Sequence, residues 1–223
     1  PLPVLGAMFR HLADSVSVPV VLHLDHGRSM DEARAAIDEG FTSVMFDGSD
    51  LPLAENIRLT RDIARMAHDN GVSCEGEIGF VGYAGGATSA RTNPAEAAEF
   101  ALETGIDAMA ISVGNVHLQH GQTGGIDDRA LAAISIATRG RVPLVIHGGS
   151  GVPSTDRHRL ARTTPICKFN IGTELRQTFG AALRQSLADQ PQEFDRIKLL
   201  SSTEAPLVEA TRRILCELTG KLA

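Results

Sequence analysis

The chain has 223 residues, of which 43% are hydrophobic and 22% are charged, a composition typical of a folded globular protein. Its net charge of −6 and the lack of a basic block argue against nucleic acid as a partner, and no apolar run approaches the roughly 20 residues of a membrane span. The three cysteines are far apart, which argues against a disulfide framework and indicates a reducing compartment.

Taken from the N-terminus, the sequence predicts strands and helices in alternation. Apolar spacing and capping residues predict helices over residues 1–16, 29–39, 52–69, 94–104, 127–139, 154–162, 173–188 and 203–218. Short apolar runs predict strands over residues 18–24, 42–47, 72–78, 107–113, 142–146 and 166–171. A strand followed by a helix, six times over, indicates a parallel sheet with helical crossovers.

Polar residues follow all six predicted strands, which favours a closed barrel over an open sheet, because an open sheet gathers its ligand at one switch point. The expected fold class is therefore α/β, a (β/α)8 TIM barrel. Eight strands are needed and six are found, so we expect the first two strands to be missing from this chain. Residues 1–223 then form a single barrel domain that is incomplete at its N-terminus.

The first predicted strand lies within Val18–Gly27, a largely apolar run that reads as a buried strand of a parallel sheet. It ends in Asp25 and His26, where α/β proteins carry their chemistry. A purely structural alternative is that these groups only cap the strand and the following turn.

Three strand ends carry a histidine: His26, His117 and His147. Three neutral imidazoles with an open fourth position form a catalytic Zn²⁺ site, so we predict that these three bind zinc. His23 competes as a ligand, but it lies inside the strand and is interpreted as a core residue or one that supports a ligand. The histidines at 11, 68 and 158 fall within helices and are interpreted as structural.

Carboxylates lie near these histidines in the sequence. Asp25 adjoins His26 and could act as a general base or orient a ligand. Glu75 and Glu77 have the same two interpretations, and their spacing places them on one side of the third strand. At least one of them could instead face a helix in a buried ion pair.

The last two strands are followed by a candidate phosphate site. Gly148, Gly149 and Ser150 offer backbone N–H groups in a turn. Asn170, Gly172 and Thr173 stand at the start of a helix, where unpaired N–H groups favour an anion. Barrels often hold phosphate at this position. The alternative is that the glycines form only a tight turn.

A metal, a carboxylate and a phosphate site together suggest enolate chemistry on a phosphorylated ketone. Asp25 would move the proton of the hydroxyl beside the bond that is cut. A lysine Schiff base is the other route to such chemistry. Only Lys168 lies on a predicted strand, and it precedes the end of that strand, so the metal route is better supported.

Six ordered motifs resemble those of the class II, metal-dependent ketose-bisphosphate aldolases over residues 18–183: HLDH, FDGS, EGEIG, SVGNVH, LVIHGGSG and CKFNIGTEL. The resemblance implies that Asp25 is the catalytic acid/base and that His26, His117 and His147 bind one Zn²⁺. It further implies that residues 148–150, with Asn170, Ile171, Gly172 and Thr173, bind the phosphate end of the substrate, and that Glu75 and Glu77 lie near the metal.

The same resemblance implies reversible cleavage of fructose or tagatose 1,6-bisphosphate to dihydroxyacetone phosphate and glyceraldehyde 3-phosphate, through a zinc-stabilised enediolate. It also implies a monovalent cation, Na⁺ or K⁺, near the phosphate loop. A cytoplasmic homodimer or homotetramer is expected, with a phosphorylated sugar as substrate and neither nucleic acid nor membrane as partner.

Three departures from the family pattern stand out. The first two strands are missing, Leu118 stands where the family usually has glycine, and the loop after Gly79 is short and lacks a carboxylate before Glu96. Two alternatives therefore stay open: a phosphosugar-binding relative without catalysis, and an aldolase for another phosphorylated ketose. A zinc hydrolase is a third, but the spacing of His23 and His26 does not suit two ligands from one strand face.

Overall fold

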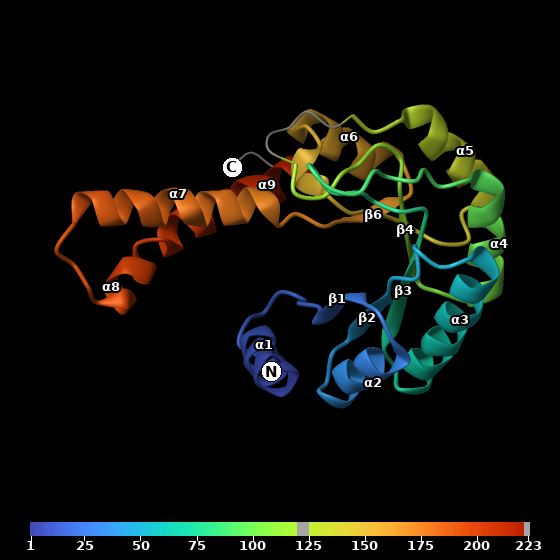
Figure 1. The fold of residues 1–223 in the computed structure, drawn as a ribbon, viewed down its shortest axis with the longest axis horizontal. Helices are drawn as coiled ribbons and strands as arrows, with labels where there is room; N and C mark the ends of the chain where they lie inside the picture. Colours follow the sequence, from blue (N-terminus) through green and yellow to red (C-terminus); the bar gives the residue numbers. More distant parts are fainter. Residues whose placement is uncertain (120–124, 221–223) are drawn as a thin grey trace. The chain divides into compact units, whose positions relative to one another are not determined.

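The computed structural model describes residues 1–119 and 125–220, in which strands alternate with helices (Figure 1). The strands are β1 (His23–Gly27), β2 (Ser43–Phe46), β3 (Ser73–Ile78), β4 (Ala108–Ile111), β5 (Leu144–Ile146) and β6 (Ile166–Phe169). The helices are α1 (Leu2–Asp14), α2 (Met30–Asp38), α3 (Leu53–Asp69), α4 (Pro94–Thr104), α5 (Asp128–Thr138), α6 (Ser154–Thr163), α7 (Thr173–Asp189), α8 (Arg196–Ser201) and α9 (Glu204–Thr219). The short 3₁₀ turn η1 (Gly149–Gly151) and helix α8 were not predicted.

The strands form one sheet in the order β1-β2-β3-β4-β5-β6, and the pairs from β1 to β5 are parallel. Each strand thus lies next to its neighbour in the sequence, with a helical crossover between them. This confirms the predicted α/β class. The described residues supply six strands, so the closed eight-stranded barrel stays a prediction, as does the loss of its first two strands.

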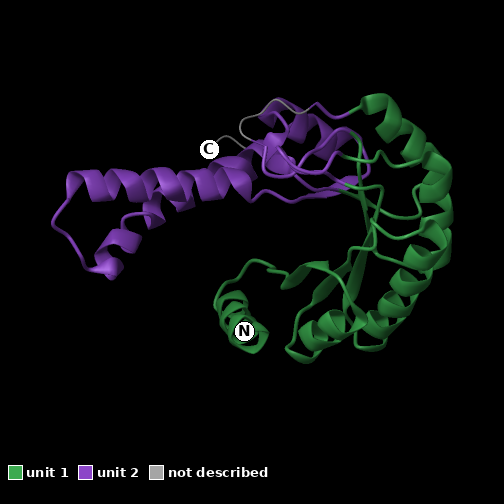
Figure 2. Cartoon of the chain, in the orientation of Figure 1, with its two compact units in different colours: residues 1–80, 89–113, 127–145 green, residues 81–88, 114–126, 146–223 purple. Residues whose placement is uncertain are grey.

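Contacts divide the chain into two compact units (Figure 2). The first comprises residues 1–80, 89–113 and 127–145, and the second comprises residues 81–88, 114–126 and 146–223. The boundary falls within β5, so β1 to β4 belong to the first unit and β6 to the second. The assignment of residues 1–223 to a single domain stays a prediction.

Strand β3 carries different kinds of residue on the two faces of the sheet in the first unit. A side chain built at Gly76 would meet Thr60 of α3 and Phe100 of α4, so Gly76 faces the helices. Glu75 and Glu77 alternate with it and point to the opposite face. Register pairs Glu77 with Ala110, which belongs to a buried apolar cluster on that inner face. The sheet therefore carries acidic groups toward its inner face, and neither glutamate faces a helix.

Helices α3, α4 and α5 form one layer against the sheet, in which α3 packs on α4 and α4 packs on α5. The predicted caps are present: the Ser29 side chain accepts a hydrogen bond from the N–H of Glu32, and the Asn93 side chain accepts from that of Ala95. Phe100 is fully buried between these helices and the sheet. Caps and apolar faces are local signals, which is why these helix boundaries could be predicted closely.

The prediction of a buried strand over residues 18–24 is wrong for most of that run. Strand β1 begins at His23, and Val18, Val20 and Val21 are exposed. Register pairs His23 with Ser43, the first residue of β2, and the Leu22 carbonyl accepts hydrogen bonds from the N–H groups of Thr42 and Ser43, so pairing with β2 ends there. Asp25 and His26 consequently lie within β1 rather than after it.

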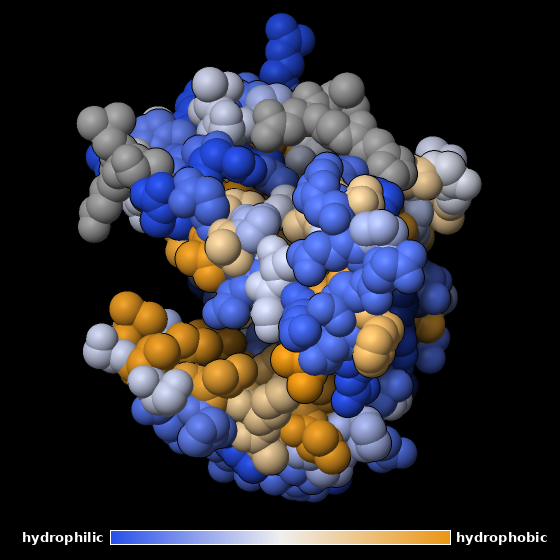
Figure 3. Space-filling view, turned by 90° about the vertical axis from the view of Figure 1, so that its left-hand side faces the viewer, coloured by the Kyte–Doolittle hydropathy of each residue, from blue (hydrophilic) through white to orange (hydrophobic). Residues whose placement is uncertain are grey.

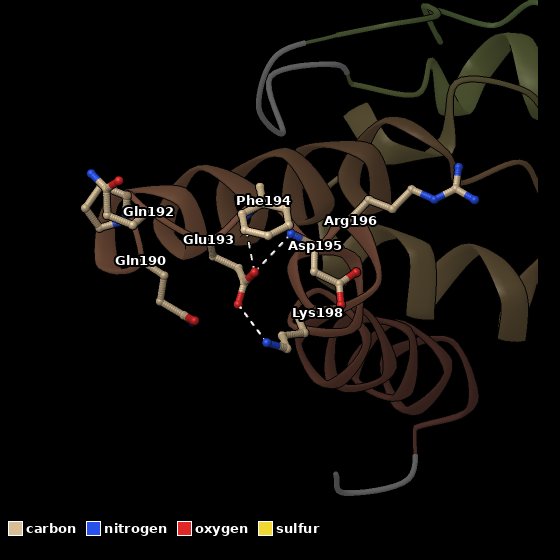
Figure 4. A pocket seen from close by; sticks show the side chains of 8 residues that line it. Gln190, Gln192, Glu193, Phe194, Asp195, Arg196 and Lys198 are labelled. Carbon is tan, nitrogen blue, oxygen red and sulfur yellow. Dashed lines mark hydrogen bonds and ion pairs between the residues drawn. The ribbon is translucent and has the colours of Figure 1, made fainter.

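In the second unit, α6 and α7 both pack against α9. The turn between α7 and α8 lines a shallow pocket, in which the Glu193 carboxylate accepts hydrogen bonds from the N–H groups of Phe194 and Asp195 and from Lys198 (Figure 4). These bonds join residues of the turn to one another and to Lys198 in α8, so they fix the local conformation of the turn.

Apolar side chains also lie on the surface, and one face of the molecule shows a patch of them (Figure 3). Exposed apolar residues of the first unit include Leu12 and Val16, which line a hollow of about 530 Å³ between α1 and β1. No helix within the described ranges is long and apolar enough to cross a membrane.

We predict that Phe100→Ala lowers the free energy of unfolding by about 3–5 kcal/mol, because it leaves a cavity between α3, α4 and β3. Urea denaturation followed by circular dichroism would measure the change. Leu102→Ala, on the same helix but 59% exposed, is the matched control and should stay within about 0.5 kcal/mol of the parent. Equal losses in the two variants would contradict the assigned packing.

Candidate functional site

The first unit carries two histidines and four carboxylates on β1 and its neighbours. His26 has a φ of 53°, an unusual conformation for a residue other than glycine. Gly27 follows it, and a Cβ there would lie 2.7 Å from the carbonyl oxygen of Met45 in β2. The backbone at the end of β1 therefore turns the His26 side chain while staying close to β2.

Asp47, directly after β2, holds the His26 ring. The Nδ1 of His26 and the carboxylate of Asp47 are 2.7 Å apart, and Ser49 donates its hydroxyl to the same carboxylate at 2.6 Å. This contact fixes one ring nitrogen and leaves Nε2 as the atom that can bind a metal. A carboxylate that orients a ligand histidine in this way is typical of metal sites in proteins.

These contacts shift the pKa of both groups. Burial alone would lower the pKa of His26, but the bond to Asp47 and the charges of Asp25 and Glu77 outweigh it and raise that pKa above its ordinary value. Burial would raise the pKa of Asp47, yet the bonds from His26 and Ser49 hold it well below its usual range. Asp47 is therefore a fixed negative charge behind His26.

Glu77 and Glu75 lie beside the two histidines of β1. The Glu77 carboxylate is 3.8 Å from Nδ1 of His26, and ligand atoms of His26, Asp47 and Glu77 lie within 4.8 Å of one another. The Glu75 carboxylate is 3.7 Å from Nε2 of His23, whose Nδ1 is 2.8 Å from the Ser43 hydroxyl. The structure thus groups Glu77 with His26. It places His23 and Glu75 together as a second pair, nearer the start of β1 and β3.

Asp25 differs from the other carboxylates because its side chain is exposed. It precedes His26 in β1, and its charge contributes to the raised pKa of that histidine. A carboxylate that is open to solvent beside a metal-binding group can accept a proton from a bound substrate. Asp47, Glu75 and Glu77 are buried, so they are better placed to orient other groups.

The second unit brings His117 and His147 together. Their rings meet edge to face with centroids 5.7 Å apart, and the other side of His117 stacks on Tyr83 at 4.9 Å. Backbone bonds hold His117 between Gly82 and Ala84. His147 is fully buried, and the side-chain nitrogen of Asn170 lies 3.3 Å from its Nε2. Two imidazoles held in this way are suitable ligands for a divalent metal such as zinc.

The predicted phosphate residues lie around the same histidine. Gly148 has a φ of 65°, and a Cβ there would lie 2.3 Å from the carbonyl oxygen of Val116, so only glycine fits. Ser150 accepts a hydrogen bond from the N–H of Glu174 through its hydroxyl, which joins the turn to the first turn of α7. The structure therefore brings the two predicted phosphate segments together.

The expectation that Gly149 offers a free backbone N–H is wrong, while phosphate binding by these segments stays a prediction. The N–H of Gly149 donates to the carbonyl of Asn170 at 3.0 Å, because pairing between β5 and β6 continues past the ends of both strands. Among the described residues, the N–H groups of Gly148, Ser150, Gly172 and Thr173 have no such bond and can bind an anion. Ile171, in the second segment, packs against the first: a Cβ at Gly149 would come within 3.2 Å of its side chain.

Leu118 adopts a left-handed conformation, with a φ of 55°. This agrees with the glycine that the family pattern has at this position, because glycine adopts such a φ without strain. Its side chain is exposed next to His117. The substitution keeps the backbone of the glycine and adds apolar surface at the site.

Asp47 is the residue of this site that sequence reasoning did not select. It ends a predicted strand, as Asp25 does, and belongs to the FDGS motif, so its position was the available signal. The sequence could not show that Asp47 contacts His26, because 21 residues separate them and the contact depends on the register of β1 and β2.

The family model described as fructose-bisphosphate aldolase class-II matches residues 1–221. The 6-phospho-5-dehydro-2-deoxy-D-gluconate aldolase of Shouchella clausii is 39% identical over 93% of this chain and 70% of its own length. The fructose-bisphosphate aldolase of Geobacillus stearothermophilus is 39% identical over 83% of this chain and 65% of its own length.

Among solved structures, the YdjI aldolase of Escherichia coli K12 matches with a TM-score of 0.80 and 32% identity, covering 99% of this chain and 76% of that one. The chain thus spans about two thirds to three quarters of the length of these relatives. The family match covers nearly every residue and includes the strand ends described above. The chain belongs to the class II fructose-bisphosphate aldolase family.

Proposed function

We propose that the chain catalyses reversible, metal-dependent aldol cleavage of a ketose 1,6-bisphosphate, fructose or tagatose, to dihydroxyacetone phosphate and glyceraldehyde 3-phosphate. The observation that carries the proposal is the arrangement around His26, where buried Asp47 holds one ring nitrogen and exposed Asp25 lies next to it in the strand. Such a pair combines an oriented metal ligand with a proton acceptor.

Zinc is the metal we propose, with His26, His117 and His147 as its ligands. Each of the three lies at or after the carboxyl end of a strand, β1, β4 or β5, the place where parallel α/β folds carry their chemistry. The imidazole donors suit zinc and leave a position open for substrate. When bound, such an ion would polarise the ketone oxygen of the substrate.

The residues of the chain have separate roles in this reaction. Asp25 accepts the proton of the hydroxyl beside the bond that breaks, and returns it in the condensation direction. The N–H groups of Ser150, Gly172 and Thr173 bind the phosphate, with Gly148 allowing its close approach. Asp47 and Glu77 keep His26 in place.

Further features follow from family membership alone. We propose that the six strands are part of a (β/α)8 barrel, that a monovalent cation binds near the phosphate loop, and that the protein acts in the cytoplasm as a homodimer or homotetramer.

A second candidate substrate is 6-phospho-5-dehydro-2-deoxy-D-gluconate, a phosphorylated keto acid. It is favoured by the relative of that name, whose match covers 93% of this chain, against 83% for the relative named as a fructose-bisphosphate aldolase. Both substrates offer a phosphate and a ketone to the same groups. A binding protein without catalysis is less well supported, because binding alone requires no acid/base such as Asp25.

The first experiment is a cleavage assay on fructose bisphosphate, tagatose bisphosphate and the phosphorylated keto acid. It would be run with zinc, with EDTA and with borohydride, which traps an imine. We expect cleavage of a ketose bisphosphate that is lost with EDTA and unaffected by borohydride. Cleavage of the keto acid alone would replace the proposed substrate, and inhibition by borohydride would replace the proposed route.

We predict that Asp25→Asn lowers kcat by about 10²–10⁴-fold, because the amide cannot accept the hydroxyl proton. Zinc content and the unfolding transition should match those of the parent, since the exposed side chain contributes little to packing. Steady-state kinetics and metal analysis would measure the two effects. Normal turnover by this variant would remove Asp25 from the role assigned to it.

We predict that His147→Ala weakens zinc binding by more than about 100-fold, since even loss of a group that supports a ligand costs about 10–100-fold. Competition with a chelator would measure the affinity. His11→Ala, on the exposed surface of α1, is the matched control and should bind zinc as the parent does. Unchanged zinc stoichiometry and affinity in His147→Ala would exclude it from the ligand set.

A further inference from the structure

We infer that Arg157 is a positioning residue for the phosphate-binding turn, which it fixes against the start of α7. This inference rests on the proposed function in so far as that function assigns phosphate to the turn. Arg157 lies on α6 and touches none of the groups that would contact substrate, so any effect on binding must act through the backbone it holds.

The guanidinium of Arg157 is fully buried, an unusual position for an arginine. Its Nε donates to the carbonyl of Val152 at 2.8 Å, and its Nη2 lies 3.4 Å from the carbonyl of Ser150. The same Nη2 donates to the carboxylate of Glu174 at 2.8 Å. One side chain therefore bonds both the turn that follows β5 and the first turn of α7.

These bonds join the two segments that supply the proposed phosphate donors. The N–H of Glu174 donates to the hydroxyl of Ser150, so Arg157 and Ser150 connect the turn and the helix in two separate ways. The carbonyl of Ser150 is directed toward Arg157 in the interior. With the turn and helix tied together, the N–H groups of Ser150 and Thr173 keep a fixed separation, which preorganises them for an anion.

The charge on Arg157 is balanced within the protein. Glu217 lies 3.6 Å from its Nη1, and Arg213 contacts both Glu174, at 3.2 Å, and Glu217, at 3.8 Å. Two cations and two carboxylates form a neutral group, so Arg157 does not serve as a counter-ion for phosphate. The planar guanidinium donates to the two carbonyls and to the carboxylate at once, and the single ammonium group of a lysine cannot reproduce this geometry.

Arg157 could instead serve only to pack α6 against α9. Three variants distinguish this structural role from positioning of the phosphate-binding turn. Arg157→Lys keeps the charge and much of the bulk but loses the fork of bonds. Arg213→Gln removes a cation from the same glutamates without touching the turn. Leu160→Ala removes a buried side chain from the same helix and lowers stability without changing the contacts of Arg157.

The test is calorimetric titration of the zinc-loaded proteins with dihydroxyacetone phosphate and, separately, with inorganic phosphate. We expect Arg157→Lys to weaken both by about tenfold, as for other residues that support a binding group. KM for the cleaved sugar should rise by a similar factor while kcat stays within about twofold. Arg213→Gln and Leu160→Ala should bind both ligands within twofold of the parent.

Binding within twofold by Arg157→Lys would overturn the inference, as would an equal loss in Leu160→Ala, which would indicate a general effect of stability. A parent protein that binds neither ligand would overturn it together with the phosphate site. If the parent binds phosphate and Arg157→Lys does not, but no sugar is cleaved, then the proposed reaction fails and the inference stands.

Discussion

Parallel pairing of successive strands is the constraint on which the site depends. Each crossover helix returns the chain to the same end of the sheet, so β1, β2 and β3 deliver their last residues to one edge. Asp47 and His26 meet because β1 and β2 are neighbours in register, although 21 residues separate them in the chain. Glu77 joins them from β3 by the same geometry. A change in register by one residue would turn these side chains to the face of the sheet that the helices cover. The site therefore forms only with the observed strand register.

The inner face of the sheet contains more buried charge than stability requires. Asp47, Glu75 and Glu77 are all buried, and burial of a carboxylate is costly unless it is paired. Histidines supply much of that pairing: His26 contacts Asp47 and Glu77, and His23 contacts Glu75. Arg28 also pairs with Asp47, at 3.1 Å. Apolar side chains of similar size would stabilise such a core as well or better. The arrangement is therefore best explained by function, in which fixed negative charge orients groups that bind a metal.

The structure also shows which features can be predicted from a single sequence. Helices such as α4 carried their own signals, a cap at Asn93 and a buried apolar face, and their boundaries lie close to those predicted. The start of β1 differs from the predicted one because an apolar run looks like a strand whether or not a partner lies beside it, and β2 begins only opposite His23. The contacts of Asp47 with His26, and of Arg157 with Glu174 and Glu217, join residues far apart in the chain and leave no local pattern. The histidines, the glycines and Asp25 could be selected because their chemistry and their place after strands are both visible in the sequence.

The contacts of His26 also bear on the choice between a metal and an imine as the means of activating a ketone. Lys168 lies within β6, on the same side of that strand as Asn170 but two residues earlier, about 6.6 Å below it at the usual rise per residue. An imine route needs that amine and makes no use of a histidine whose Nδ1 is held by a buried carboxylate. A metal route uses just such a histidine, because the bond to Asp47 fixes the ring and increases the basicity of Nε2. Asp47 also pairs with Arg28 at 3.1 Å, which offsets part of the cost of burying its charge, but its bond to His26 has a use only on the second route. This is the physical reason to prefer that route.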